Sequence, residues 1–310
     1  MKVYHSIQDF KKENIAPTSL TIGSFDGVHR GHELVLNQLK NVANQSDTKS
    51  VVLTFTPHPR IYFNPKTDLR LLQTDTEKIE SLSRQDVDFL IIQKFDDAFA
   101  KQSPETYIRQ LKENLGMQNV LIGYDHRFGK DRAGNFEFVK SLETKYDYKT
   151  HQIEVLNVDN INLSSSVIRK ALQAGNLEKA NEFLGHYYSL SGVVVRGNQL
   201  GRTLGYPTAN IDVAHPYKLI PKDGVYLVQS TIDGQKLFGM MNIGVRPTIE
   251  GKIQVIETHF FDFDKDIYGK NIQISLISRL RDEQKFASLD ELKQQLQRDE
   301  LVAMQLAKLR

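Results

Sequence analysis

The stretch Thr21–Leu36, TIGSFDGVHRGHELVL, decides the fold of the first half of the chain, because it begins as a strand and ends as a helix. Gly23, Gly27 and Gly31 allow tight backbone turns and the close approach of a ligand. The helix that begins near His32 presents free N–H groups and the positive end of its dipole, which suits a phosphate. We therefore expect a phosphate-binding loop here.

Two histidines, His29 and His32, lie three residues apart where this loop becomes a helix. An imidazole near pH 7 donates a hydrogen bond to a phosphate oxygen, and its protonated form adds positive charge. This chemistry fits stabilisation of the transition state of a phosphate displacement without a covalent intermediate. Two alternatives stay open: a metal site, which needs a third ligand, and plain surface residues of a strand-to-helix turn.

The rest of the first half alternates apolar runs with helical patterns. Runs rich in β-branched residues start at Ser19, Ser50, Val87 and Asn119, and each is typical of a strand buried on both faces. One of the helical segments between them opens with Ser103-Pro104-Glu105, a capping serine followed by proline and an acid. Alternating strands and helices predict a Rossmann-like, doubly wound parallel sheet that binds ligands at the carboxyl ends of its strands.

Two loops that follow predicted strands carry polar side chains. His58 lies between Pro57 and Pro59, which stiffen the loop and hold the imidazole out, although a plain strand-ending turn explains the same residues. The later loop GYDHRFGK offers Asp125 and Arg127. Its glycine spacing and the residue after its lysine exclude a P-loop.

A serine run precedes a further helix in LSSSVIRKAL. Ser164 and Ser165, with Arg169 about one turn later, would make an anion site at the helix N-terminus. Capping of the helix explains one serine equally well, so both interpretations stay open.

The pattern changes around Gly185, where short alternating segments separated by Gly, Asn and Pro begin. Asp233-Gly234 is a hairpin-turn dipeptide between two strand-like runs. This pattern predicts a compact antiparallel barrel or sandwich. One amphipathic terminal helix follows, which opens with the capping box Ser288…Glu291.

The length of 310 residues exceeds what one core usually organises, and the two periodicities predict an α/β domain over residues 1–184 and a β domain over 185–310. With 40 Lys and Arg against 38 Asp and Glu, the chain shows no basic excess for nucleic acid. The count of 0 Cys excludes thiol chemistry. Without a signal-type or membrane-spanning apolar run, we expect a cytoplasmic protein that acts on small molecules and binds no membrane.

A glycine-rich loop opens the second half, with Gly197, Gly201 and Gly205 four residues apart. This spacing does not match G-x-G-x-x-G, but glycine loops still lay backbone N–H groups along phosphates. Thr208 and Asn210 then share one face of an extended stretch, and their oxygens suit Mg²⁺ that also coordinates substrate phosphates. A polar turn is the alternative.

A single carboxylate, Glu257, lies in the strand-like run QVIETHFFDF. If its face points inward, Glu257 is a candidate base for a substrate hydroxyl, and if outward, it is a solvated strand residue. The segments NIGVRPT and LRDEQKF add four polar or stacking candidates: Asn242, Arg246, Arg281 and Phe286.

These segments resemble a known family. GSFDGVHRGH is similar to the G-x-F-D-G-x-H-x-G-H signature of prokaryotic bifunctional FAD synthetases, and TFTPHP and LSSSVIR resemble two further segments of that family. The resemblance implies an FMN adenylyltransferase of nucleotidyltransferase fold, in which the FMN phosphate attacks the α-phosphorus of ATP and pyrophosphate leaves. His29 and His32 would hold the ATP phosphates. The other implied phosphate-, nucleotide- or flavin-binding residues are Gly23, Phe25, Gly31, His58, Asp125, Arg127, Ser164, Ser165 and Arg169.

Two positions depart from that family's pattern. Ser166 stands where the family usually has Thr, which keeps the hydroxyl, and His126 stands where Phe is usual.

The second half resembles the riboflavin kinase module of the same family through GRTLGYPTAN, NIGVRPT and LRDEQKF. The resemblance implies a six-stranded antiparallel barrel that transfers the ATP γ-phosphoryl group to the ribityl 5′-hydroxyl of riboflavin. Thr208 and Asn210 would position Mg²⁺, Glu257 would accept the hydroxyl proton, and the segment from Arg281 to Phe286 would border the flavin. The further implied binding residues are Gly197, Gly201, Arg202, Gly205 and Asn242.

The leading hypothesis is therefore one chain that makes FMN from riboflavin and then FAD from FMN with two ATP. Two alternatives remain: a nucleotidyltransferase acting on another small phosphate substrate, and a flavin-sensing protein with decayed catalysis. The second of these predicts that one of His32, Thr208, Asn210 or Glu257 is missing, whereas all four are present.

Overall fold

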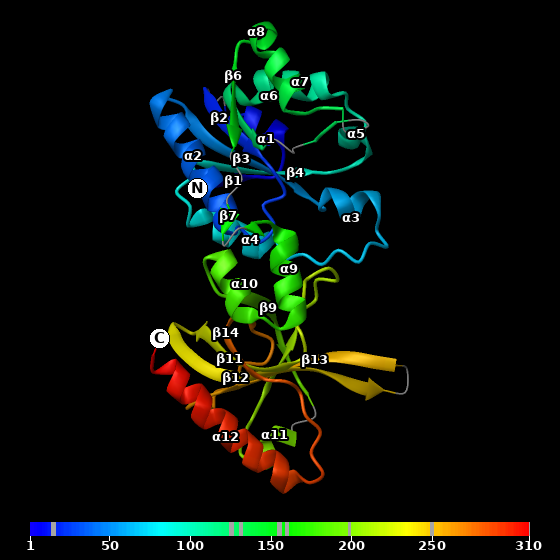
Figure 1. The fold of residues 1–310 in the computed structure, drawn as a ribbon, viewed down its shortest axis with the longest axis vertical. Helices are drawn as coiled ribbons and strands as arrows, with labels where there is room; N and C mark the ends of the chain where they lie inside the picture. Colours follow the sequence, from blue (N-terminus) through cyan, green and yellow to red (C-terminus); the bar gives the residue numbers. More distant parts are fainter. Residues whose placement is uncertain are drawn as a thin grey trace. The chain divides into compact units, whose positions relative to one another are not determined.

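The computed structural model describes residues 1–310 except 14–16, 124–126, 130–132, 154–156, 159–160, 198–199, 249–250 and 310. Contacts between residues divide the chain into two compact units, Met1–Ser165 and Ser166–Arg310 (Figure 1). This division lies earlier than the change of sequence pattern near residue 184. Helices α9 (Ser165–Ala174) and α10 (Leu177–Leu184) account for the difference, because most of their residues group with the second unit.

The first unit is built on a six-stranded sheet in the order β1-β4-β3-β2-β5-β6, with every pair parallel. The strands are β1 (Lys2–Tyr4), β2 (Thr18–Ile22), β3 (Lys49–Thr56), β4 (Phe89–Lys94), β5 (Met117–Gly123) and β6 (Lys149–Ile153). The four apolar runs correspond to β2, β3, β4 and β5, so the predicted parallel sheet is confirmed. The sequence patterns missed β1 and β6, because edge strands are short and partly exposed.

The helices of this unit are α1 (Ile7–Lys11), α2 (Arg30–Gln45), α3 (Pro59–Phe63), α4 (Asp75–Ser83), α5 (Asp97–Ala100), α6 (Pro104–Leu115), α7 (Phe136–Ser141) and α8 (Glu143–Tyr146). Helix α6 begins as predicted, because the Ser103 side chain accepts a hydrogen bond from the Thr106 N–H and Pro104 occupies the first turn. It ends at Gly116, whose φ of 62° suits glycine.

The core of the first unit lies on both faces of the sheet. Val51 and Leu53 of β3 belong to one buried cluster, whereas Val52 between them belongs to a second cluster with Leu36 and Leu39 of α2. Successive strand residues point to opposite faces, so both faces are buried. This explains why the strands read as continuous apolar runs.

The second unit is a closed antiparallel barrel in the order β10-β13-β12-β11-β14-β9. Its strands are β9 (Tyr188–Val195), β10 (Ala209–Asp212), β11 (Gly224–Ile232), β12 (Gln235–Thr248), β13 (Gly251–Phe260) and β14 (Asn271–Arg281). The predicted hairpin turn joins β11 to β12, where Asp233 and Gly234 have φ of 51° and 79°. The predicted barrel is thus confirmed. A separate pair of two-residue strands, β7 (Asn157–Val158) and β8 (Ile161–Asn162), completes the described strands.

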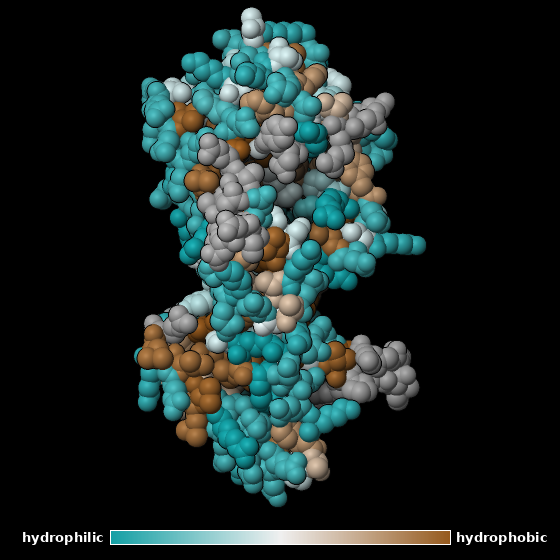
Figure 2. Space-filling model, viewed as in Figure 1, coloured by the Kyte–Doolittle hydropathy of each residue, from teal (hydrophilic) through white to brown (hydrophobic). Residues whose placement is uncertain are grey.

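The terminal helix α12 (Leu289–Ala307) packs on the outside of the barrel (Figure 1). Its N-cap is Ser288, which accepts a hydrogen bond from the Glu291 N–H as the capping box predicts. Ala303 of α12 belongs to a buried cluster with Leu227 and Met240 of the barrel wall. A short helix α11 (Leu200–Thr203) precedes β10. The face in Figure 2 is mainly hydrophilic, with apolar side chains gathered on part of the second unit.

Candidate active sites

The first candidate site is the loop between β2 and α2. Phe25 and Val28 adopt φ of 47° and 36°, and Gly27 adopts 92°. Positive φ is uncommon for residues other than glycine, so the surrounding structure must hold this loop in its conformation. The loop ends at His29, the N-cap residue of α2.

The imidazoles of His29 and His32 stack at the N-terminus of α2, with ring centroids 3.7 Å apart and an angle of 19° between the rings. The Phe25 ring lies 5.0 Å from that of His32. A Cβ at Gly31 would lie 3.1 Å from the His29 ring, and a Cβ at Gly23 would lie 3.2 Å from the Phe25 ring, so both glycines give the rings room. The structure brings these five predicted residues together at a helix end that suits a phosphate.

His32 is held in its neutral form. Burial, and then the charges of His29 and Lys78, lower the pKa of His32 well below its usual 6.5. Its Nδ1 accepts a hydrogen bond from the His29 N–H at 3.3 Å, which leaves the proton of the neutral ring on Nε2. Of the two roles expected for this imidazole, the structure favours hydrogen-bond donation through Nε2 over positive charge.

This state of His32 is directly measurable. Because burial depresses the pKa, we expect the ring to be neutral at pH 6.5 and to titrate only below it. The unfolded chain then binds the proton more readily, so the contribution of His32 to the free energy of unfolding is present above about pH 6.5 and is lost as the pH falls. NMR titration of ring-labelled histidines, assigned with His32→Gln, measures the pKa. A pKa at or above 6.5 contradicts the prediction.

A buried carboxylate attaches the loop to a second segment. Asp26, which is 2% exposed, accepts hydrogen bonds from the Leu72 N–H at 2.9 Å and the Gln73 N–H at 3.1 Å. These residues lead into α4, which carries Lys78 with only 6% of its surface exposed. Lys78 was not predicted as a site residue, because a lysine in an amphipathic helix usually indicates a solvated face.

The two predicted serines of the LSSSVIR segment lie in different environments. Ser165 donates its hydroxyl proton to the Asp26 carbonyl at 2.9 Å, so it lies against the same loop. Ser164 is exposed. Arg169 is half-buried in the part of α9 that groups with the second unit, and its place among the phosphate-binding residues stays a prediction.

His58 occupies the start of a helix. It is the N-cap of α3, and its Nδ1 accepts a hydrogen bond from the Arg60 N–H at 3.1 Å. This capping explains the local sequence, while a ligand contact of His58 stays a prediction. Arg127 is exposed, and Asp125 and the atypical His126 lie outside the described residues.

Aromatic rings, which the sequence analysis also missed, gather where β3 and β4 end. Successive edge-on or tilted ring contacts join Phe63, Tyr62, Phe95, Phe99, Tyr107 and Phe128 at centroid distances of 5.3–5.6 Å. Phe63 is 68% exposed at one end of this aromatic row. Tyr107, at 3% exposed, belongs to the core, so it is the Phe63 end of the row that offers a surface to a flat aromatic ligand. No spacing rule in the sequence could have grouped residues from five segments.

The second candidate site lies on the outer wall of the barrel. Strand register places Asn210 of β10 opposite Glu257 of β13, Glu257 opposite Asn242 of β12, Asn242 opposite Val225 of β11, and Val225 opposite Arg281 of β14. The neighbouring row, which includes Tyr226, Met241 and Thr258, is fully buried inside the barrel. Residues directly opposite on adjacent strands point to the same face, so four predicted residues share one row.

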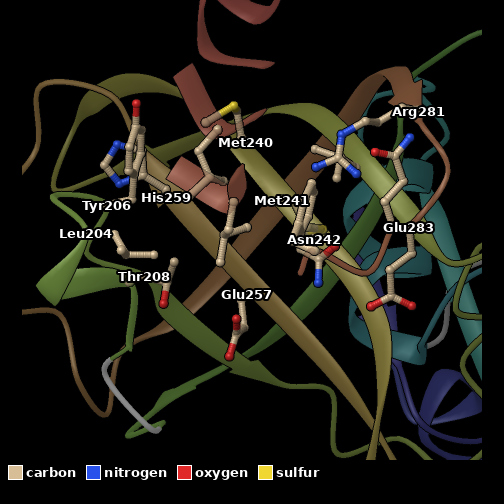
Figure 3. A pocket seen from close by; sticks show the side chains of 16 residues that line it. Leu204, Tyr206, Thr208, Met240, Met241, Asn242, Glu257, His259, Arg281 and Glu283 are labelled. Atoms are coloured by element: carbon tan, nitrogen blue, oxygen red, sulfur yellow. The ribbon is translucent and has the colours of Figure 1, made fainter. Parts of the chain in front are cut away.

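A cavity of about 310 Å³ opens on this wall. Figure 3 shows Thr208 and Glu257 close together on one side of it, with Asn242 and Arg281 farther along. Glu257 faces away from the barrel interior yet lines the cavity and is half-buried, so neither simple expectation for its strand face describes it. The predicted residues in the cavity lining are Gly201, Thr208, Asn242, Glu257, Arg281 and Phe286.

The side chains around Asn210 carry oxygen atoms that could bind a hard cation such as Mg²⁺. Gly197 leaves the space that the Asn210 amide occupies, since a Cβ at Gly197 would lie 2.3 Å from Nδ2 and 2.6 Å from Oδ1. The Asn210 amide and the Thr208 hydroxyl carry oxygens of the kind that Mg²⁺ prefers. Arg202 is exposed, and Gly205 has φ of 87° with open space around it.

Two acids of α12, which the sequence analysis also missed, contact the cavity residues. Asp299 accepts hydrogen bonds from Arg281 Nε at 2.9 Å and Nη2 at 2.7 Å. Glu300 accepts one from the Tyr206 hydroxyl at 2.8 Å. Both contacts join residues far apart in sequence, and only the fold reveals them.

Among the residues that the structure describes, no three His, Asp or Glu side chains gather as a metal-binding group. Among those same residues, no helix combines the length and apolar character that crossing a bilayer requires.

Comparison with known proteins decides the family. The FAD synthetase family matches residues 11–167, and the riboflavin kinase family matches residues 184–307. A bifunctional riboflavin kinase/FMN adenylyltransferase of Escherichia coli K12 is 37% identical over 306 residues, which cover 98% of this chain and 97% of the relative. This chain belongs to the bifunctional riboflavin kinase/FMN adenylyltransferase family.

Further members of the riboflavin kinase/FMN adenylyltransferase family support this assignment. The Haemophilus influenzae relative is 38% identical over 91% of both chains, and the Bacillus subtilis relative is 35% identical over 94% of this chain and 93% of its own. A Streptococcus pneumoniae crystal structure, described as a macrolide-efflux protein, matches 98% of this chain and 99% of its own with a TM-score of 0.87 and 30% identity. Its fold therefore extends over both units of this family member.

Proposed function

We infer that this protein phosphorylates riboflavin with ATP to give FMN and ADP, and then adenylylates FMN with a second ATP to give FAD and pyrophosphate. The observation that carries this is the presence of both family matches, one after the other, in one chain. ATP is the co-substrate of both reactions. We further assign adenylyl transfer to residues 1–184 and phosphoryl transfer to residues 185–310.

Adenylyl transfer uses the loop between β2 and α2. An FMN phosphate oxygen bonds to the α-phosphorus of ATP as the bond to the pyrophosphate oxygen breaks. The Nε2–H of His32 donates a hydrogen bond to a phosphate oxygen, and the positive end of the α2 dipole adds to its effect, which stabilises the growing negative charge. The exposed Phe63 end of the aromatic row is our proposed contact for the flavin ring.

Phosphoryl transfer uses the barrel cavity. Glu257 accepts the proton of the ribityl 5′-hydroxyl while that oxygen bonds to the γ-phosphorus and ADP leaves. Thr208 and Asn210 would hold Mg²⁺, which when bound neutralises charge on the phosphates. Arg281 and Phe286 would border the flavin, since both line the same cavity and the guanidinium lies 5.9 Å from the Phe286 ring. Because both reactions consume ATP, we place the protein in the cytoplasm.

A direct assay tests the proposal. Purified protein is incubated with riboflavin, ATP and Mg²⁺, and flavins are separated by chromatography. We expect FMN to appear first and FAD to follow. Formation of neither compound, with tight flavin binding, would instead support a flavin-sensing protein. Adenylylation of another phosphate substrate without FMN formation would support the alternative hypothesis of a nucleotidyltransferase with a different substrate.

The proposed metal site can be tested through its neighbour Gly197. In Gly197→Ala the new Cβ meets the Asn210 side chain, which must move because it is the flexible partner. We expect the Mg²⁺ concentration for half-maximal FMN formation to rise about tenfold, which corresponds to roughly 1.4 kcal/mol. Activity is measured against Mg²⁺ at saturating substrates.

The matched control is Asn210→Ala, alone and combined with Gly197→Ala. If Gly197 acts through Asn210, the double variant matches Asn210→Ala. Independent losses that multiply in the double variant would exclude this explanation.

A further inference from the structure

Helix α12 touches the kinase cavity at two places through neighbouring acids. Asp299 accepts hydrogen bonds from Arg281 of β14, and Glu300 accepts one from the Tyr206 hydroxyl. Figure 3 shows Tyr206 and Arg281 on opposite sides of the cavity. Leu292 and Leu296 of the same helix also line the cavity. The terminal helix is therefore part of the cavity and not only a cover for the apolar cluster.

Tyr206 belongs to the glycine loop that leads to Thr208. Its backbone N–H donates to the Gly201 carbonyl at 2.8 Å, which closes the loop on itself. Its ring is buried, with 8% exposed, and meets the His259 ring edge-on at 5.1 Å. The side chain of Tyr206 is thus fixed at both its ring and its hydroxyl.

The next residue is fixed from another side. The Pro207 carbonyl accepts a hydrogen bond from His259 Nδ1 at 2.8 Å. His259 lies two residues after Glu257 on β13. The two residues before Thr208 are therefore both held in place: Tyr206 by its hydrogen bond to α12, and Pro207 by its hydrogen bond to the strand of Glu257.

The hydroxyl of Tyr206 remains a donor throughout the working pH range. Burial, followed by the hydrogen bond to Glu300, raises the pKa of Tyr206 to about 12. A hydrogen bond to a carboxylate is stronger than one between neutral groups, so this contact constrains the loop more than an ordinary hydroxyl contact does.

We propose that Tyr206 and Glu300 are positioning residues of the kinase reaction: through their hydrogen bond, α12 holds the segment Gly201–Thr208 where Thr208 meets the metal and phosphates of ATP. This inference rests on the proposed kinase function. Attachment of α12 itself does not depend on this contact, because Ala303, Leu296 and Met304 pack in the apolar cluster on the barrel. Loss of one hydroxyl should therefore release the loop and leave the helix bound.

The test uses the full chain and four variants: Tyr206→Phe, Glu300→Ala, their combination, and Glu300→Gln. FMN formation is measured with MgATP varied at saturating riboflavin, and then with riboflavin varied at saturating MgATP. FMN-to-FAD conversion and the thermal unfolding midpoint are measured on the same preparations. Tyr187→Phe is the matched control, because Tyr187 packs against the same apolar cluster.

We expect the KM for MgATP to rise about tenfold in Tyr206→Phe and in Glu300→Ala, with the KM for riboflavin changed less than twofold. The combined variant should lose no more than either single variant, because both remove the same contact. In Glu300→Gln the KM for MgATP should stay close to the wild-type value, since the amide oxygen accepts the same hydrogen bond. Tyr187→Phe and all FMN-to-FAD rates should match wild type.

An unchanged KM for MgATP in the single variants overturns the inference, as do single-variant losses that multiply in the combined variant. Equal rises in both KM values with a lowered unfolding midpoint also overturn it, because they indicate a purely structural contact. These outcomes presuppose that the wild-type chain makes FMN. If wild type makes none, the proposed kinase function fails, and the inference fails with it.

Discussion

Replacement of His29 and His32 together by alanine should abolish FAD formation from FMN and leave riboflavin phosphorylation unchanged. The two rings stack where phosphates would meet the N-terminus of α2, and neutral His32 offers its Nε2–H to them. Loss of one donor to a developing negative charge typically lowers kcat about 10²–10³-fold, so loss of both rings should exceed that. The rate of FAD formation at saturating FMN and ATP measures the effect.

The same chain supplies the control for this experiment, because FMN formation from riboflavin reports on an intact barrel. His32→Gln adds a second control: its amide N–H₂ can donate where Nε2–H does, so this variant should lose less activity than His32→Ala. Retention of FAD formation in the double variant, or an equal loss of both activities in a folded protein, would rule out this assignment of roles.

Replacement of Glu257 by glutamine should produce the opposite pattern. Glutamine keeps the size of the side chain but cannot accept the hydroxyl proton, so FMN formation should fall by about 10²–10⁴ in kcat. The KM for riboflavin should change little, because the lost interaction matters mainly in the transition state. FMN-to-FAD conversion should persist. Steady-state rates for each half-reaction measure both effects.

The cavity provides a matched carboxylate for comparison. Glu283 also lines it, and its Oε1 lies 2.1 Å from where a Cβ on Gly244 would stand, so Glu283 lies against the backbone of β12. Glu283→Gln should therefore affect kcat far less than Glu257→Gln. Comparable losses in the two variants would show that charge in the cavity, and not proton transfer by Glu257, explains the effect.

Local patterns predicted the elements that bury continuous or periodic apolar surface. The sequence predicted β2, β3, β4 and β5 as strands, because both faces of their sheet are buried and each strand is a continuous apolar run. The sequence also predicted two helix caps and one turn, because each satisfies a local backbone requirement: Ser103, Ser288 and Asp233-Gly234. β1 and β6 were not predicted, because short edge strands carry little apolar signal.

Residue types and spacing identified some of the side chains that lie together in the structure, such as His29 with His32, but not what holds them. His29 and His32 lie three residues apart at the start of a helix, and this spacing alone predicts that their rings lie close together. Lys78 near His32, and Glu300 at Tyr206, depend on pairing of distant segments. The neutral state of His32 is likewise a property of burial, which a spacing rule does not contain.

The edges of the two sheets have a consequence for the behaviour of the protein at high concentration. The parallel sheet ends in β1, three residues long and opening with Lys2, and β6, five residues long and opening with Lys149. Short, charged edges discourage another chain from adding a strand. In the barrel, each of the six strands pairs on both sides over part of its length, but in the described register residues 244–248 of β12 and 251–256 of β13 pair only with each other. Strand addition from another molecule is therefore discouraged at the edges of the parallel sheet. The end of the β12–β13 hairpin, with Val245 and Ile253 exposed, offers a strand edge instead, so association there should respond to protein concentration.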